Sequence, residues 1–227
     1  MIYILNLETA TKNCSVSISQ NGCTLVCKEL ADEGFSHAER LHVFIEAACA
    51  DAKISLSQLN AVAVSCGPCS YTGLRIGVSA AKGLCYALHI PLISVDTLAS
   101  MASKINITSG CIVPMIDARR MEVYSAVFNY DLKKIRSIKA EVLTENSFEN
   151  TTELIYFLGD CNEKAKTILT KSNFIFVDAF VYPSAREMSI MAFQKFKTQC
   201  FEDVAYFEPY YLKDFMVTQS KKTQTQV

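Results

Sequence analysis

The segment Ala61–Gly83 reads AVAVSCGPCSYTGLRIGVSAAKG and carries the clearest structural pattern in the chain. Its first five residues form a short apolar run that is compatible with a buried strand, and CGPCS marks a turn. A helix is predicted to begin near Tyr71 and to end at about Leu88, because Pro91 follows. A buried strand that leads through a turn into a helix predicts an α/β fold.

The predicted helix contains three glycines, and each interior glycine costs about 1 kcal/mol relative to alanine. Gly73 and Gly77 lie one turn apart, and Ala80 and Ala81 extend the same smooth stripe. A separate apolar stripe begins at Leu74. Two interpretations remain open: close packing inside the core of this chain, or one stripe against the core and the smooth stripe against another protein or a ligand.

The composition is that of one or two globular domains, since half of the 227 residues are hydrophobic. The 22 basic and 23 acidic residues nearly cancel, which argues against a chain that binds nucleic acid alone through its charge. No stretch approaches the roughly 18 apolar residues of a membrane span, and the first residues lack the pattern of a signal peptide. We therefore expect a cytoplasmic protein, not bound to a membrane, whose ten cysteines are reduced.

One pattern occurs twice, 109 residues apart. Residues 2–8 form an apolar strand that ends on Glu8, and a small polar turn and an alternating strand follow. Cys111–Ile116 is a second apolar strand, which ends on Asp117 before a tight turn and a run of β-branched and aromatic residues. The repetition predicts two similar lobes, each opening with a β-meander, as in actin-like folds.

We place the first lobe at residues 1–104 and the second, smaller lobe at residues 105–213. The second lobe is expected to contain a helix at Ser147–Phe157 and a last helix at Ser184–Phe196, which is a candidate for packing back on the first lobe. The tail, residues 214–227, is polar and aperiodic and is predicted to be disordered.

A further helix of the first lobe is predicted from Ser36 to about Ala52, with Ser36 and Glu39 as a capping box. This helix and the helix after Tyr71 carry more apolar or small surface than one core contact needs. Two such lobes are therefore expected to meet as a four-helix bundle. The predicted partner-binding residues are His37, Leu41, Phe44, Ile45, Ala48, Gly73, Leu74, Arg75, Gly77, Ala80 and Ala81.

Metal and phosphate motifs are not found. The chain has only three histidines, His37, His42 and His89, and the first two are five apart on different helix faces. The turns Thr9–Asn13 and Ala118–Met121 contain no glycine, so they do not predict phosphate cradles. Nucleotide binding or a subunit contact is left open for Glu8, Thr9, Asp117 and Arg119.

The turn before the glycine-containing helix consists of Gly67, Pro68, Cys69 and Ser70. Cys69 precedes a helix N-terminus, where the pKa of a thiol is lowered, but no histidine has an evident place beside it. We prefer the interpretation that Cys69 is a residue that the turn tolerates without a chemical role, and the alternative is a nucleophile. Arg75, in the first turns of the helix, is expected to pair with a carboxylate or to reach a partner.

Four segments, in order along the chain, resemble the TsaB (YeaZ) family: LNLETAT at 5–11, GPCSYTGLRIG at 67–77, IDARRMEVY at 116–124 and PYYLK at 209–213. The resemblance covers the chain from Met1 to about Asp214. It departs from the family at Cys69, where glycine is usual, and at Glu8, where many members have aspartate. It implies an actin-like (ASKHA, ribonuclease H-like) fold.

The resemblance also implies a function in tRNA processing. It places the chain in the bacterial complex that attaches a threonylcarbamoyl group to the adenosine 3′ of the anticodon, as a non-catalytic dimerisation and activation subunit. The implied partners are a TsaD-type catalytic subunit and a TsaE-type ATPase, with tRNA contacted only through the complex and a homodimer when the partner is absent.

ATP and metal are then expected in the partner subunits, with no cofactor or metal bound by this chain alone. TsaD-like catalytic chains place two histidines four apart after the next strand, whereas the corresponding residues 94–102 contain none. The alternative is a stand-alone actin-like ATP-dependent enzyme or a peptidase of the same superfamily.

Overall fold

The computed structural model describes residues 1–31, 37–68, 71–149 and 152–212. The strands of the first lobe are β1 (Tyr3–Glu8), β2 (Asn13–Gln20), β3 (Cys23–Ala31), β4 (Ala61–Ser65) and β5 (Leu92–Val95). Those of the second lobe are β6 (Cys111–Asp117), β7 (Glu122–Asn129), β8 (Lys134–Val142), β9 (Ile155–Gly159) and β10 (Phe174–Phe176). The helices are α1 (His37–Ala52), α2 (Tyr71–Leu88), α3 (Thr97–Ala102), α4 (Asn162–Lys166) and α5 (Ala185–Lys197), with a 3-10 turn at Leu56–Gln58.

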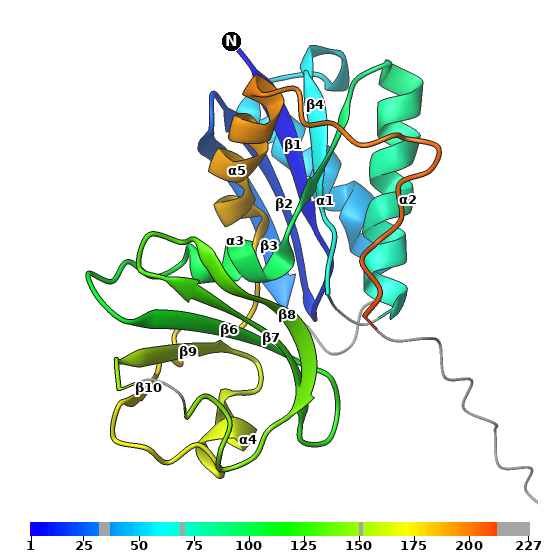
Figure 1. Cartoon of the computed structure of the whole chain (residues 1–227). Coiled ribbons are helices and arrows are strands. Elements are labelled where there is room, and N and C mark those ends of the chain that lie inside the picture. The colour runs from blue at the N-terminus through cyan, green and yellow to red at the C-terminus, as the bar shows by residue number, and fades with distance from the viewer. Residues whose placement is uncertain (32–36, 69–70, 150–151, 213–227) are drawn as a thin grey trace, which may run out of the picture.

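Two five-stranded mixed sheets form two lobes, one above the other in Figure 1. The strand orders are β3-β2-β1-β4-β5 and β8-β7-β6-β9-β10. In each sheet an antiparallel meander of three strands continues into two parallel strands. The predicted repetition of one β-meander plan in two lobes is therefore confirmed.

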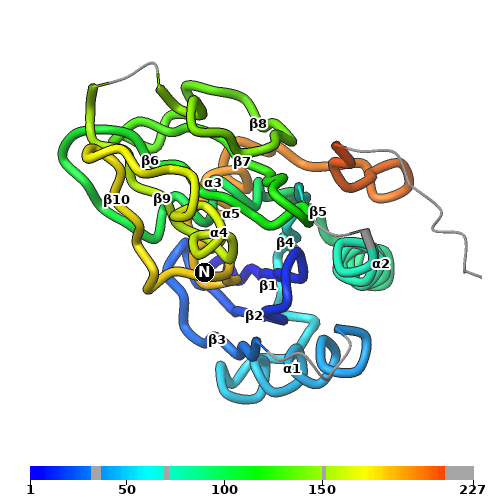
Figure 2. The backbone as a smooth tube through the Cα atoms, turned by 90° about the horizontal axis from the view of Figure 1, so that it is seen from below, coloured from blue at the N-terminus to red at the C-terminus, as the bar shows by residue number. Residues whose placement is uncertain are grey.

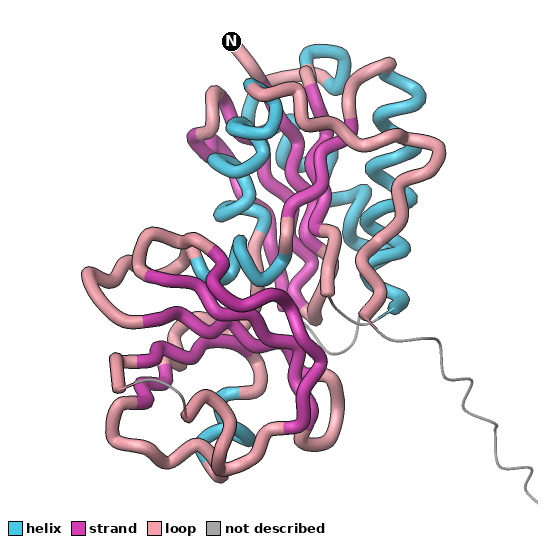
Figure 3. Tube along the Cα trace, viewed as in Figure 1, coloured by secondary structure: helices cyan, strands magenta, loops and turns pink. Residues whose placement is uncertain are grey.

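Helices cover both faces of the first sheet, so its central strands are apolar on both faces. Helices α1 and α2 lie on one face, and α5, which follows the second lobe in the chain, lies on the other (Figure 2). Alternate residues of β1 separate the two cores: Leu5 packs toward α1 and α2, and Ile4 packs toward Met188 of α5. The second lobe is mostly strand and loop (Figure 3).

The second sheet is covered by short helices. Leu98 and Met101 of α3 pack on Ile112 and Ile116 of β6. Sequence periodicity predicts a helix over Ser147–Phe157, and this prediction is wrong, because the apolar end of that segment begins β9, which pairs with β6 and β10. A short continuous apolar run fits a buried strand as well as a helix. Among the described residues, no helix has the length and apolar character to span a membrane.

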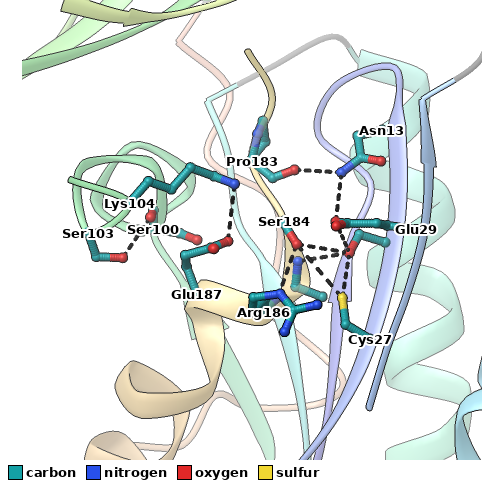
Figure 4. Close-up of polar contacts among 12 residues, drawn as sticks. Asn13, Cys27, Glu29, Ser100, Ser103, Lys104, Pro183, Ser184, Arg186 and Glu187 are labelled. Atoms are coloured by element: carbon teal, nitrogen blue, oxygen red, sulfur yellow. Dashed lines mark hydrogen bonds and ion pairs between the residues drawn. The ribbon is translucent and has the colours of Figure 1, made fainter. Parts of the chain in front are cut away.

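Polar contacts join the two places where the chain crosses between the lobes (Figure 4). The first crossing follows α3, and the second precedes α5. Lys104, just beyond α3, forms an ion pair with Glu187 of α5 at 3.2 Å, and both side chains are largely buried. The amide of Asn13 donates to the carbonyl of Pro183 at 2.9 Å. These contacts fix the start of α5 against β2 and α3.

Residues 201–212 run from α5 across the first lobe, and we call them the strap. Glu202 forms an isolated antiparallel bridge with Leu92 at the edge of β5. Lys82 of α2 then donates to the carbonyl of Ala205 at 2.9 Å, and the backbone N–H of Tyr210 donates to the carbonyl of Cys66 at 2.8 Å. The PYYLK segment therefore lies beside Cys66, which directly precedes the GPCSYTGLRIG segment.

The glycine stripe of α2 faces the core of this chain. A Cβ built at Gly73 would lie 2.3 Å from the backbone oxygen of Thr9, and one at Gly77 would lie 2.3 Å from Thr9 Oγ1. Thr9 Oγ1 also donates to the carbonyl of Gly73 at 2.8 Å. The expectation that these two glycines let a partner helix approach is therefore wrong, because Thr9 already occupies the space beside them.

Three sequence predictions lie outside the described residues. These are the capping role of Ser36, the conformation of Cys69 and Ser70, and the state of the tail.

Gly77→Ala is expected to destabilise the chain by about 1–3 kcal/mol, because the added methyl group overlaps Thr9. Gly83→Ala is the matched control: a Cβ there meets nothing within 4 Å, so helix propensity should stabilise the chain by up to about 1 kcal/mol. Urea unfolding followed by circular dichroism measures both. Equal free energies of unfolding for the two variants would contradict the close contact at Gly77.

Candidate functional site

The outer surface of α1 and α2 is the side of these helices that does not pack into the core of the first lobe. Seven predicted partner-binding residues are buried within this chain: Leu41, Ile45, Ala48, Gly73, Leu74, Gly77 and Ala81. His37, Phe44 and Ala80 are half-buried, and Arg75 is exposed. Most of the residues that were assigned to a partner surface on these two helices therefore belong to the core of this chain.

A groove of about 580 Å³ runs between the outer sides of the two helices. It is lined by Ala38 and His42 of α1 and by Arg75, Ile76, Ser79, Ala80, Gly83 and Leu84 of α2. Ile76, Ala80 and Leu84 supply a half-buried apolar floor. We call this feature the α1–α2 groove.

Sequence reasoning missed six of the lining residues, although their helical spacing carried a signal. Ile76, Ala80 and Leu84 recur every four residues, and Ala38 and His42 do the same on α1. Such rows lie along one side of a helix. Of these residues only Ala80 was predicted, because the row that starts at Gly73 is more conspicuous in composition.

His37 links α1, α2 and the turn after β1. Its ring forms a hydrogen bond with the backbone of Thr11, and its Cδ2 would lie 3.3 Å from a Cβ added at Gly73. Burial lowers the pKa of His37 despite that hydrogen bond. This hydrogen bond ties the start of α1 to the turn after β1.

Glu8 lies at the carboxyl end of β1 and is fully buried. Its Oε1 accepts hydrogen bonds from the backbone N–H of Ala10 at 2.7 Å and from Ser65 Oγ at 2.8 Å. Its Oε2 is buried without a hydrogen-bond partner among the described residues. Burial raises the pKa of Glu8 to about 7, although the hydrogen bonds and the charge of Lys104 act in the opposite direction.

The turn after β6 is held by different elements. Lys164 of α4 pairs with Asp117 and also donates to the carbonyl of Arg120 at 2.8 Å. The backbone N–H of Arg119 donates to Asp117 Oδ1 at 3.1 Å, and the Arg119 side chain is exposed. Asp117 therefore contacts α4 and Arg119 contacts Asp117, whereas Glu8 contacts β4 and Thr9 contacts α2.

Metal ligands are not gathered in the part of the chain that the structure describes, where no group of three His, Cys, Asp or Glu residues could hold an ion. The nine described cysteines are all free thiols. Burial raises the pKa of the Cys66 thiol, next to the turn motif, to about 12, which keeps it protonated at neutral pH.

The raised pKa of Glu8 predicts a pH-dependent stability. Between about pH 4.5 and pH 7 the folded chain holds this proton more strongly than the unfolded chain, so the contribution of Glu8 to stability falls as the pH rises. Relative to the wild type, Glu8→Gln should therefore gain about 2–3 kcal/mol in free energy of unfolding between about pH 5 and pH 8. Urea unfolding at a series of pH values measures the difference.

Glu29→Gln is the control, because hydrogen bonds from Ser184, Asn13 and Ser15 outweigh burial and lower the pKa of Glu29. Its stability contribution therefore changes only below its ordinary pKa, and the variant should track the wild type over this range. A pH-independent difference between Glu8→Gln and the wild type would contradict the burial of an ionisable carboxyl at this position.

Comparisons with known proteins cover most of the chain. Residues 32–220 match the family model described as TsaD: tRNA N6-adenosine threonylcarbamoyltransferase. The tRNA threonylcarbamoyladenosine biosynthesis protein TsaB of Escherichia coli (strain K12) is 30% identical over 221 residues, which cover 93% of this chain and 94% of that protein. A tRNA N6-adenosine threonylcarbamoyltransferase of Lactococcus lactis subsp. cremoris is 39% identical over 112 residues, or 43% of this chain and 33% of that protein.

Solved structures share the fold. YeaZ from Pseudomonas aeruginosa has a TM-score of 0.78 at 23% identity and covers 93% of this chain and 100% of its own. The activator of the 2-hydroxyisocaproyl-CoA dehydratase from Clostridium difficile, with bound ADPNP, has a TM-score of 0.50 at 9% identity over 89% of this chain and 99% of its own, which shows the fold alone. The predicted actin-like α/β fold is confirmed, and the chain belongs to the TsaB (YeaZ) family.

Proposed function

We propose that this chain is a non-catalytic subunit that binds and activates a TsaD-type catalytic subunit for threonylcarbamoylation of the adenosine 3′ of the anticodon in tRNA. The observation that carries the proposal is the α1–α2 groove on a chain of this family. Its lining is mainly apolar or small, with His42, Arg75 and Ser79 as polar groups. An apolar centre with a few polar groups is typical of protein interfaces.

The match to the TsaD family model supports the choice of partner. Because residues 32–220 fit that model, a TsaD-type subunit is expected to contain a lobe with the same helix pair. Two lobes of one plan can pair through equivalent surfaces about a pseudo-twofold axis. The same geometry allows two copies of this chain to form a homodimer when the partner is absent.

The positions at which catalytic residues would be expected support a non-catalytic role. Residues 94–102 contain no histidine, and neither turn that follows β1 or β6 contains glycine. Glu8, the acid at the carboxyl end of β1, is fully enclosed by its own chain. ATP and metal are accordingly assigned to the partner subunits, a TsaE-type ATPase is taken to dock on the pair, and tRNA is contacted through the complex.

Ser79→Glu tests the binding surface. Ser79 is exposed and lines the groove, so a glutamate there should leave the fold intact but place a larger, charged side chain in the interface, which must lose its water when the partner binds. The affinity for the TsaD-type subunit of the same cell should fall at least tenfold, or about 1.4 kcal/mol. Gel filtration and isothermal titration calorimetry measure complex formation.

Ser172→Glu is the matched control, since Ser172 is exposed in the second lobe, away from the groove. It should bind the TsaD-type subunit as the wild type does. Failure of the wild-type chain to bind this subunit would contradict the proposed function. Equal affinities for wild type and Ser79→Glu would instead place the interface elsewhere.

The competing hypothesis, a stand-alone ATP-dependent enzyme or peptidase, is tested on the purified chain. We expect no stoichiometric zinc or iron by metal analysis and negligible ATP hydrolysis. Turnover of ATP or of a peptide that Glu8→Gln abolishes would favour the enzyme. The folding of Glu8→Gln, followed by circular dichroism, is the control for that result.

A further inference from the structure

The α1–α2 groove leaves apolar surface uncovered by the described residues. Ile76, Ala80 and Leu84 form its floor on α2, and Ala38 faces them from α1. Covering apolar surface yields about 25 cal/mol for each Å² removed from water. Any apolar segment held beside this groove therefore gains free energy by entering it.

The strap brings the chain to one end of the groove. Arg75, which lines the groove, donates from Nε to the hydroxyl of Tyr211 at 3.3 Å, and its guanidinium lies 5.9 Å from the centre of the Tyr211 ring. The backbone of Tyr210 is fixed to Cys66. Leu212, the last residue that the structure describes, is therefore anchored next to the groove.

The sequence that follows Leu212 is Lys213-Asp214-Phe215-Met216-Val217, and the rest of the chain, Thr218–Gln226, contains no apolar residue before the last valine. An extended chain spans about 3.3–3.6 Å per residue, so Phe215 can reach roughly 10 Å from Leu212. The groove follows α2 from Arg75 to Leu84, nine residues that rise about 14 Å. The apolar triplet is within reach of the floor.

We propose that Phe215, Met216 and Val217 of this chain occupy the α1–α2 groove when no partner is bound. The proposal rests on the proposed function, since it makes the chain's own tail a competitor for the partner's surface. The tail is the occupant that the geometry favours over a second copy, because its attachment beside Arg75 gives it a high effective concentration at the groove.

Charges along the tail match charges along the helices. Asp214 precedes the apolar triplet and would enter beside Arg75. Helices α1 and α2 begin at the same end, because His37 lies next to Gly73. The exposed Glu46, one turn beyond His42 on α1, is therefore at the far end, where the tail lysines 221 and 222 would follow.

A docked tail would regulate assembly. The apparent affinity for the partner is reduced by the fraction of chains whose groove is open. If the tail occupies the groove in about nine chains out of ten, a variant that cannot dock its tail should bind the TsaD-type subunit about tenfold more tightly.

A single tryptophan tests the docking directly, because the full chain contains none. In full-length Phe215→Trp, the tryptophan emission should lie at short wavelength and should not depend on protein concentration. Addition of the TsaD-type subunit should shift it to longer wavelength. Thr223→Trp, in the polar part of the tail, is the matched control and should emit as a solvent-exposed tryptophan in both states.

Substitutions at Gly83 separate the groove from other sites for the tail. Gly83 lines the groove, is exposed, and has no atom within 4 Å of an added Cβ, so its variants should fold. In the Phe215→Trp background, Gly83→Glu should shift the emission to long wavelength, whereas Gly83→Ala should not. Phe215→Asp with Met216→Asp should tighten partner binding about tenfold.

The outcomes distinguish this proposal from the proposed function. Equal emission from Phe215→Trp and Thr223→Trp would overturn tail docking, even if the TsaD-type subunit binds. Emission that depends on concentration would overturn it in favour of a second copy in the groove. If the emission responds to Gly83→Glu but the TsaD-type subunit does not bind, tail docking is supported and the proposed function fails.

Discussion

The contact between Thr9 and two glycines of α2 is the constraint on which the first lobe depends. Thr9 follows β1 directly, and its hydroxyl donates to the carbonyl of Gly73 at 2.8 Å while its side chain lies against Gly77. A β-carbon on α2 at either position would push the helix away from the sheet. The close approach turns Leu74 and Val78 into the core and leaves Ile76 and Ala80 on the outside, so it also determines which residues line the groove.

The turn that precedes α2 is where distant parts of the chain converge. Gly67 adopts a φ of 102°, a conformation that favours glycine. Its N–H donates to Thr97 Oγ1 at 3.1 Å, and the Thr97 N–H donates back to the Gly67 carbonyl at 3.2 Å. The strap adds the hydrogen bond from Tyr210 to Cys66. Two elements that are far apart in the sequence, the start of α3 and the strap, thus hold this turn in place.

Local sequence patterns predicted most of the fold, and the predictions failed where contacts between distant segments decide the structure. The bounds Ala61–Ser65 follow from a short apolar run before turn residues, and they were predicted as observed. Ile155–Gly159 was missed because its apolar residues fit two periods equally well until their strand partners are known. The smooth stripe of α2 was assigned to a partner surface for a similar reason, although Gly73 and Gly77 lie against Thr9. Periodicity shows that stripes exist, but only the position of Thr9 shows which stripe is inside.

The residues at the carboxyl end of β1 connect the packing of α2 to the proposed function. In open α/β sheets, ligands usually bind where the strand order reverses, outside the carboxyl ends of the strands. In the first sheet that point lies between β1 and its neighbours β2 and β4, and side chains of the chain itself fill it. Glu8 is enclosed beside Ser65, and Thr9 is enclosed beside α2. Since these residues hold α2 against the sheet, the outer side of α2 stays exposed beside α1 and lines the α1–α2 groove. This packing agrees with the proposed function, in which the helix pair contacts another protein.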